Sequence, residues 1–189
     1  ITKGTVYIKG GTISDSVAGS VSATGSSKTY ITGGVSKNSM KNHLWVTSKA
    51  TVEVTNYTLD GCWEHAIMSQ GTFIWKGGNI VNTSDGALVL YNNAGTCAMT
   101  DVEIDGGGSV FNANGGTFKM ENVVAHNITG RFAQVKKGNA KITNCKFYGS
   151  EKNTDTGIEI YAGTSEIKNI YMENMGVHGF IVRQSAKVN

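Results

Sequence analysis

A Gly-Thr motif followed by alternating apolar residues recurs along the chain and constrains the fold more than any other feature. Clear copies are GTVYIKGG, GTFIWKGG, GTFKMENV and GTSEIKNI, with ATVEVTNY as a close variant. Aligned on the second apolar residue, the copies give the column Ile8, Ile31, Val54, Trp75, Met99, Met120, Ile142 and Ile167. The mean spacing is ~22.7 residues, a period typical of solenoids. Because these eight units fill nearly the whole chain, we predict one repeat domain over residues 1–189.

Each unit alternates apolar and polar residues with a period of two, as a strand with one buried face does. Two residues after the aligned position, every copy carries Gly, Asn or Asp, which tolerate a left-handed backbone. This first turn column is Gly10, Gly33, Asn56, Gly77, Asp101, Asn122, Asn144 and Asn169. A second turn column holds Gly61, Asn82, Gly106, Asn127, Gly149 and Asn174. Three short strands and three sharp turns per unit predict one rung of a solenoid with parallel ladders between rungs ~4.8 Å apart.

The pattern resembles the right-handed parallel β-helix of the pectate-lyase-like superfamily. The resemblance rests on the Asn and Gly turn columns and on third strands such as Gly157-Ile158-Glu159-Ile160. It implies an all-β, right-handed parallel β-helix of about eight rungs of ~23 residues with three short sheets, and right-handed crossovers are also the general rule. The superfamily includes polysaccharide lyases and hydrolases, phage tailspikes and bacterial surface adhesins. The resemblance therefore implies an extracellular or cell-surface location and contact with glycans.

Composition excludes several classes of protein. Hydrophobic residues at 39% and charged residues at 16% do not fit a disordered chain. The 17 basic and 14 acidic residues form no basic run, so we expect no nucleic-acid partner. No apolar run approaches ~18 residues, so no membrane-spanning helix is expected. The chain begins at Ile1 without Met or an apolar leader, and we expect a fragment of a longer protein.

Cysteine usage gives no sign of a metal or cofactor site. Cys62, Cys97 and Cys145 lack the spacings of zinc ligands. We interpret them as small apolar fillers of the core, and one disulfide remains the alternative. The sequence also contains neither a cluster of three Asp residues suited to calcium nor a calcium-binding nonapeptide. We therefore expect no metal and no cofactor.

The outer face of the second strand carries the most promising chemistry. A carboxylate beside an imidazole beside a phenol is a plausible proton-transfer set, and tyrosine rings offer stacking surfaces to sugars. The candidate catalytic residues are Glu103, Asp105, His126, Lys146 and Tyr148. The candidate binding residues are Tyr148, Tyr171 and Glu173. An ordinary solvated face with charges paired across rungs is the alternative interpretation.

Two further groups of residues suggest weaker hypotheses. The start of the third strand holds His43, Glu64, Asp85, Arg131 and His178, and we expect His43 and Glu64 to be adjacent. An outward column of the first strand consists of Thr5, Lys28, Thr51, Thr72, Thr96, Thr117, Asn139 and Thr164. This column is compatible with an ice-binding face, but Thr is also simply favoured in strands.

Two functions follow as hypotheses. The favoured one is a structural and adhesive β-helix segment of a secreted or surface protein, which contacts glycans or a second copy through its end rungs. The alternative is a polysaccharide lyase or glycoside hydrolase with its site on the second-strand face. The paired-Asp and Arg-x-Lys elements of polygalacturonases are missing, and this favours the non-enzymatic hypothesis.

Overall fold

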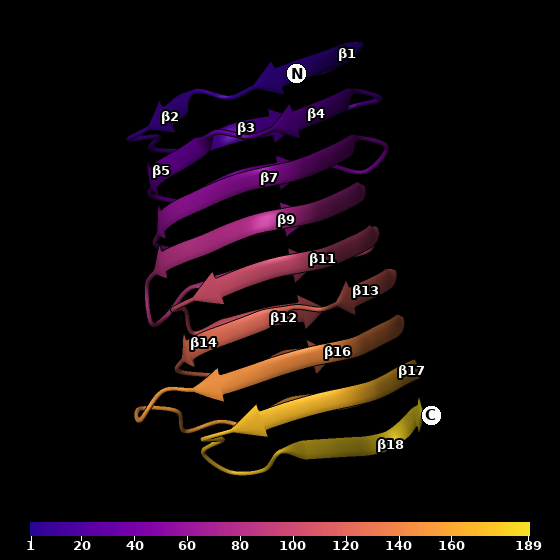
Figure 1. The fold of residues 1–189 in the computed structure, drawn as a ribbon. Coiled ribbons are helices and arrows are strands. Elements are labelled where there is room, and N and C mark those ends of the chain that lie inside the picture. The colour runs from indigo at the N-terminus through magenta and orange to yellow at the C-terminus, as the bar shows by residue number, and fades with distance from the viewer.

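The strands of the chain wind into a stack of eight parallel turns, and the last strand begins a ninth (Figure 1). This computed structural model describes residues 1–189, except for the side chain of Gln184. The described residues contain no helix, and therefore none that could span a membrane. The strands are β1 (Thr5–Lys9), β2 (Thr12–Ser14), β3 (Gly19–Ala23), β4 (Lys28–Thr32), β5 (Val35–Ser39), β6 (Asn42–Val46), β7 (Thr51–Cys62), β8 (His65–Ser69), β9 (Thr72–Thr83), β10 (Leu88–Asn92), β11 (Thr96–Asp105), β12 (Ser109–Ala113), β13 (Thr117–Glu121), β14 (Val124–Ile128), β15 (Ala133–Val135), β16 (Asn139–Gly149), β17 (Ile158–Glu173) and β18 (Phe180–Val188).

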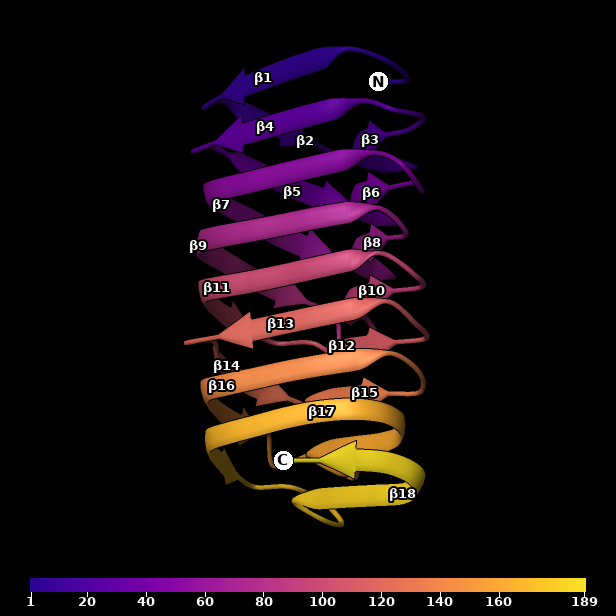
Figure 2. The ribbon, with the colours of Figure 1, turned by 90° about the vertical axis from the view of Figure 1, so that its right-hand side faces the viewer.

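The strands form three parallel sheets along the solenoid. Sheet 1 contains β1, β4, β13 and the first parts of β7, β9, β11 and β16, followed by the middle of β17 and the end of β18. Sheet 2 contains β2, β5, β14 and the second parts of the long strands. Sheet 3 contains β3, β6, β8, β10, β12, β15 and the starts of β17 and β18. In Figure 2 the near strands run leftward and the far strands rightward as the chain descends, so the solenoid is right-handed.

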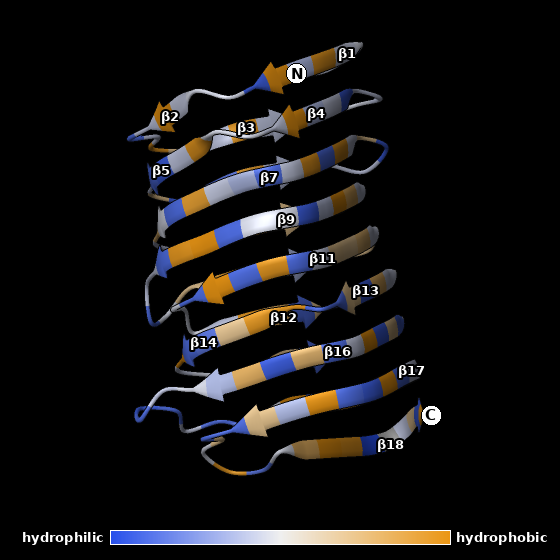
Figure 3. Cartoon of the chain, in the orientation of Figure 1, coloured by the Kyte–Doolittle hydropathy of each residue, from blue (hydrophilic) through white to orange (hydrophobic). Residues whose placement is uncertain are grey.

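The register of sheet 1 reproduces the repeat seen in the sequence. Ile8 pairs with Ile31, Val54 with Trp75 and Met120 with Ile142. The remaining members of the aligned column continue the same ladder through to Ile167. Apolar and polar residues alternate along these strands (Figure 3), and the apolar ones face a common core. The predicted all-β solenoid of about eight rungs of ~23 residues is confirmed.

The first turn column is left-handed in every rung, as its residue types predict. All eight residues have φ between 49° and 67°. A sharp turn is predicted at this column, but the bend needs only one left-handed residue. The strands β7, β9, β11 and β16 therefore pass from sheet 1 into sheet 2 without interruption.

The second turn column is left-handed with one exception. Asn82, Asn127 and Asn174 have φ of 55°, 56° and 58°, whereas Gly149 is not left-handed, contrary to its predicted place in the column. The physical reason is a register shift after Ala125, which pairs Ile128 with Gly149. The chain then makes a longer excursion before it enters sheet 3 at β17.

The three cysteines lie in the core, which confirms their interpretation as apolar fillers. Cys62, Cys97 and Cys145 are all buried, and no disulfide joins them among the described residues. Burial raises the pKa of Cys62 and Cys145 to about 11 and that of Cys97 to about 12. These thiols are therefore uncharged near neutral pH and unsuited to nucleophilic chemistry.

Candidate functional site

The predicted catalytic and binding residues lie together on the outer face of sheet 2. Asp105 pairs with His126 between rungs five and six, and Tyr148 pairs with Glu173 between rungs seven and eight. Lys146 pairs with Tyr171 in the neighbouring column. The parallel register therefore gathers the candidate residues onto rungs five to eight.

Three rings on this face form a continuous surface, which we call the aromatic row: His126, Tyr148 and Tyr171. The His126 and Tyr148 rings are stacked, with centroids 4.8 Å apart and planes 5° apart. This separation is the one expected for equivalent positions on adjacent parallel strands. Tyr171 belongs to the neighbouring column, and its ring follows that of Tyr148 at 5.6 Å with a tilt of 49°. Tyr171 keeps 49% of its surface exposed, so the end of the row is open to a ligand.

Carboxylates border the aromatic row and are held by neighbouring groups. Oδ1 of Asp105 accepts a 2.6 Å hydrogen bond from Nδ2 of Asn127. Oε2 of Glu173 accepts a 2.8 Å hydrogen bond from the Tyr171 hydroxyl. This hydrogen bond, with the charge of Glu173, raises the pKa of Tyr171 above its usual value. The Tyr171 phenol is therefore a poor acid at neutral pH but a well-oriented part of a binding surface.

The spacing on this face suits binding better than proton transfer. Nε2 of His126 lies 4.0 Å from Oε1 of Glu103. Proton transfer needs partners within ~2.6–3.2 Å or a bridging water. A shallow hollow of about 310 Å³ beside the row is lined by Asp101, Val102, Glu103, Asn122 and Val124. The face thus offers stacking area and hydrogen-bonding groups on an open surface.

The second predicted group is not brought together. Asn42 pairs with His65, so Glu64 lies opposite Lys41 and not beside His43, which corrects the expected adjacency. The buried His43 ring lies 2.7 Å from Oγ of Ser36 through Nδ1 and 3.2 Å from the Gly61 carbonyl oxygen through Nε2. Burial lowers the pKa of His43 to about 4. His43 is therefore a neutral core residue that solvent does not reach.

Sequence reasoning missed an ionic cluster on the outer face of sheet 3, centred on Glu159. Only 3% of the Glu159 side chain is exposed. Its carboxylate accepts hydrogen bonds from Arg183 (2.6 Å) and Gln134 (3.1 Å) and lies 3.3 Å from Nε of Arg131. Burial would raise the pKa of Glu159, but these donors outweigh it and lower the pKa below its usual value. The partners of Glu159 come from neighbouring rungs and lie more than 20 residues away in the sequence, so local alternation gives no sign of them.

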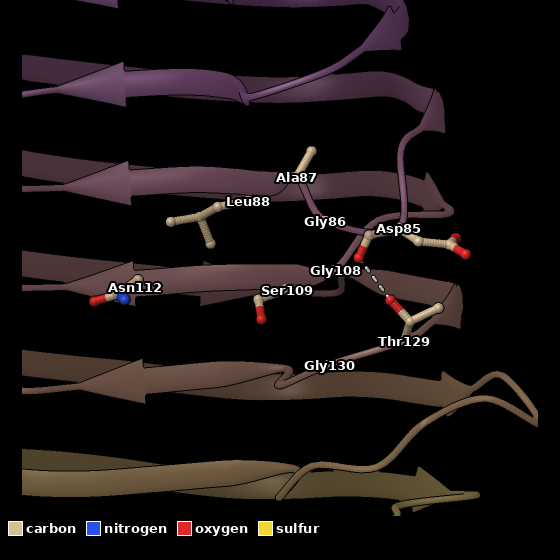
Figure 4. A pocket seen from close by; sticks show the side chains of 9 residues that line it. All are labelled: Asp85, Gly86, Ala87, Leu88, Gly108, Ser109, Asn112, Thr129 and Gly130. Carbon is tan, nitrogen blue, oxygen red and sulfur yellow. Dashed lines mark hydrogen bonds between the residues drawn. The ribbon is translucent and has the colours of Figure 1, made fainter.

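A second feature that the sequence did not reveal is a hollow of about 280 Å³ at the corner between sheets 2 and 3 (Figure 4). We call it the corner hollow. Its lining comes from rungs four to six and consists of Asp85, Gly86, Ala87, Leu88, Gly108, Ser109, Asn112, Thr129 and Gly130. The only sequence signal for it was a Gly near this corner in each of three successive rungs, at Gly86, Gly108 and Gly130.

The described residues form no candidate metal site, and the chain matches no known family or structure. Across the part of the chain that the structure describes, no group of three or more His, Cys, Asp or Glu side chains is placed to hold a metal ion. No protein-family model matches the chain, and comparisons with curated proteins and with solved structures found no match.

Proposed function

We propose that the chain is a structural and adhesive β-helix segment of a secreted or cell-surface protein, and that it binds glycans on the outer face of sheet 2. The observation that carries the proposal is the aromatic row of His126, Tyr148 and Tyr171. Aromatic rings present a rigid apolar face together with a polar edge, which suits the faces and hydroxyls of sugar rings. Membership of the pectate-lyase-like superfamily belongs to the same proposal, and the stacked rungs and left-handed Asn columns support it.

The carboxylates beside the row support polar contacts with sugar hydroxyls. Asp105 and Glu173 each have one oxygen fixed by an internal hydrogen bond, which orients the carboxylate and leaves the other oxygen for a ligand. Charged acceptors make stronger hydrogen bonds than neutral ones. Their position beside stacked rings is the combination expected for a glycan-binding surface.

Catalysis by a polysaccharide lyase or glycoside hydrolase is the second candidate function. The observation in its favour is the unbroken sequence of carboxylate, imidazole and phenol formed by Asp105, His126 and Tyr148. Against it stands the 4.0 Å separation of His126 from Glu103. Turnover of any glycan that binds would favour this candidate.

The test is glycan binding by the whole chain on an array, followed by titration calorimetry with the best ligand. We expect Tyr148→Ala to weaken binding about tenfold, the equivalent of ~1.4 kcal/mol. Tyr7→Ala is the matched control, because Tyr7 is an exposed tyrosine stacked on Tyr30 in sheet 1, away from the row. Equal affinities for the wild type and Tyr148→Ala would rule out this role of the row.

A further inference from the structure

The corner hollow is separate from the aromatic row in position and in chemistry. It lies across the turn that follows sheet 2, where Gly86, Gly108 and Gly130 occupy rungs four, five and six (Figure 4). Its lining residues do not include any member of the aromatic row. A ligand in the hollow would therefore be held by a different set of side chains.

The backbones of successive rungs approach each other closely at the glycines of the hollow. A Cβ atom at Gly108 would collide with the carbonyl oxygen of Asp85, and one at Gly130 would collide with that of Gly108. No side chain fits at either position, because real Cβ atoms essentially never come within 3.0 Å of such an atom. At Gly86, in contrast, a Cβ would meet no atom within 4 Å. The space in front of Gly86 is thus open, while backbone atoms of the preceding rung occupy the space in front of Gly108 and Gly130.

The walls combine hydroxyl groups with an apolar floor. Oγ of Ser109 accepts a hydrogen bond from the Arg131 backbone N–H (3.1 Å), and its own hydrogen remains for a ligand. The Thr129 hydroxyl donates to the carbonyl oxygen of Asp85 (2.8 Å), which fixes its orientation (Figure 4). Ala87 and Leu88 supply the apolar part of the lining.

Charge at the rim of the hollow is balanced. The Asp85 carboxylate lies 3.5 Å from Nζ of Lys152, which reaches it from the long excursion in rung seven. The rim therefore presents one negative and one positive charge to a ligand. This balance favours a neutral ligand over an anionic or a cationic one, because either charge on the ligand would meet a like charge.

An exposed tryptophan lies at the same corner of the solenoid, on the rung before Ser84, which precedes the lining residue Asp85. Cys62 pairs with Thr83, so Trp63 occupies the same corner one rung before Ser84. Oγ of Ser84 donates a hydrogen bond to the Trp63 carbonyl oxygen, which ties the two rungs together at this point. Trp63 is 74% exposed and therefore contributes little to the core. A large exposed aromatic side chain on the rung adjoining a polar recess is a candidate stacking surface for a ligand in that recess.

We propose that the corner hollow and Trp63 form a binding site for a single neutral sugar residue. The hydroxyls of Ser109 and Thr129, together with the ring of Trp63, match a ligand with several hydroxyls and an apolar face. The volume of about 280 Å³ limits the occupant to roughly one ring, since pockets for drug-sized molecules begin at ~300 Å³. This site goes beyond the glycan-binding role proposed for sheet 2 and does not depend on it.

The test uses neutral methyl hexosides at millimolar concentration as probes, with the Trp63 indole N–H signal as the NMR readout. We expect at least one hexoside to shift this signal in the full chain. Gly86→Phe should weaken that binding at least tenfold, because the ring fills the open space. Trp63→Ala should weaken it by a similar factor. This variant lacks the indole signal, so its binding is followed by saturation transfer to the sugar. The φ of Gly86 lies outside the left-handed region, so Phe at this position is not strained.

Two control variants distinguish the corner hollow from the aromatic row and from a general effect of an added ring. Gly179→Phe also places a ring at a glycine whose φ lies outside the left-handed region. A Cβ atom there would contact only Met172 Cε, at 3.6 Å. This variant should leave hexoside binding unchanged. Tyr148→Ala should likewise leave hexoside binding unchanged, and loss of binding in that variant would assign the ligand to the aromatic row. Failure of every neutral hexoside to bind, or preference for the corresponding uronic acids, would overturn the proposal. If Gly86→Phe fails to fold, Trp63→Ala decides the question.

Discussion

At the scale of single residues, the asparagines of the turn columns combine two functions. Asn122 has a φ of 54°, a conformation that costs most L-residues about 1–2 kcal/mol. Its Nδ2 also donates a 2.9 Å hydrogen bond to Oδ1 of Asp101 on the previous rung. The same side chain thus tolerates the bend and links neighbouring rungs.

This dual role predicts the effect of substitution at Asn122. We expect Asn122→Ala to lower the free energy of unfolding by about 1–2 kcal/mol, because alanine is strained in the left-handed region and cannot bond to Asp101. Asn122→Gly should recover the part of the loss that comes from the backbone. Urea unfolding of the three proteins measures both effects. An alanine variant more stable than the glycine variant would contradict the argument.

The buried imidazole of His43 predicts a loss of stability in mild acid. Its pKa is about 4 in the folded chain against about 6.5 when unfolded, so below pH 6.5 the unfolded state binds a proton that the folded state does not. The free energy of unfolding should therefore fall by ~2 kcal/mol between pH 7 and pH 5 from this group alone. Urea unfolding across this range, compared with His43→Gln, checks it. An equally steep fall in the variant would show that other groups cause it.

At the scale of strands, the sequence predicts which residues face the core but not how outward side chains pair. Val54, Trp75 and Met99 stack in the core as their spacing indicates, because alternation within a strand is a local property. The Glu159 cluster and the contact of Lys152 with Asp85 join residues more than 20 positions apart. These contacts depend on the length of each turn, and the register shift that displaced Gly149 shows that one residue is enough to change them.

The core column predicts a large effect of truncation in β9. Trp75 is fully buried in sheet 1, so Trp75→Ala should lower the free energy of unfolding by ~3–5 kcal/mol through the cavity it leaves. Ile74→Ala is the matched control, because Ile74 precedes it on the same strand and faces outward, partly exposed. Chemical denaturation of both variants gives the comparison. A loss below ~1 kcal/mol for Trp75→Ala would be incompatible with its place in the core.

At the scale of the whole molecule, the residues that stabilise the solenoid lie inside it, whereas the candidate binding residues lie on its outer faces. The repeat alone predicts the eight rungs, since each rung only has to match its neighbours. The predicted site residues on sheet 2 lie together for the same reason, because equivalent positions stack. The corner hollow escaped prediction because its side chains, such as Ser109 and Thr129, come together only through the way that successive turns stack at the corner. Glycines near one corner of successive rungs predict turns, whether or not those turns leave a recess.

The parallel ladders also determine how the molecule responds to force. The backbone hydrogen bonds between rungs run along the solenoid axis, from each strand to the next one below it. Tension applied along that axis therefore loads one interface between rungs at a time, and the weakest interface yields first. The chain would lengthen in discrete steps, each releasing about one rung of polypeptide, while the remaining rungs stay folded. Such a stack unfolds rung by rung and thereby limits the force that it transmits from one end of the solenoid to the other.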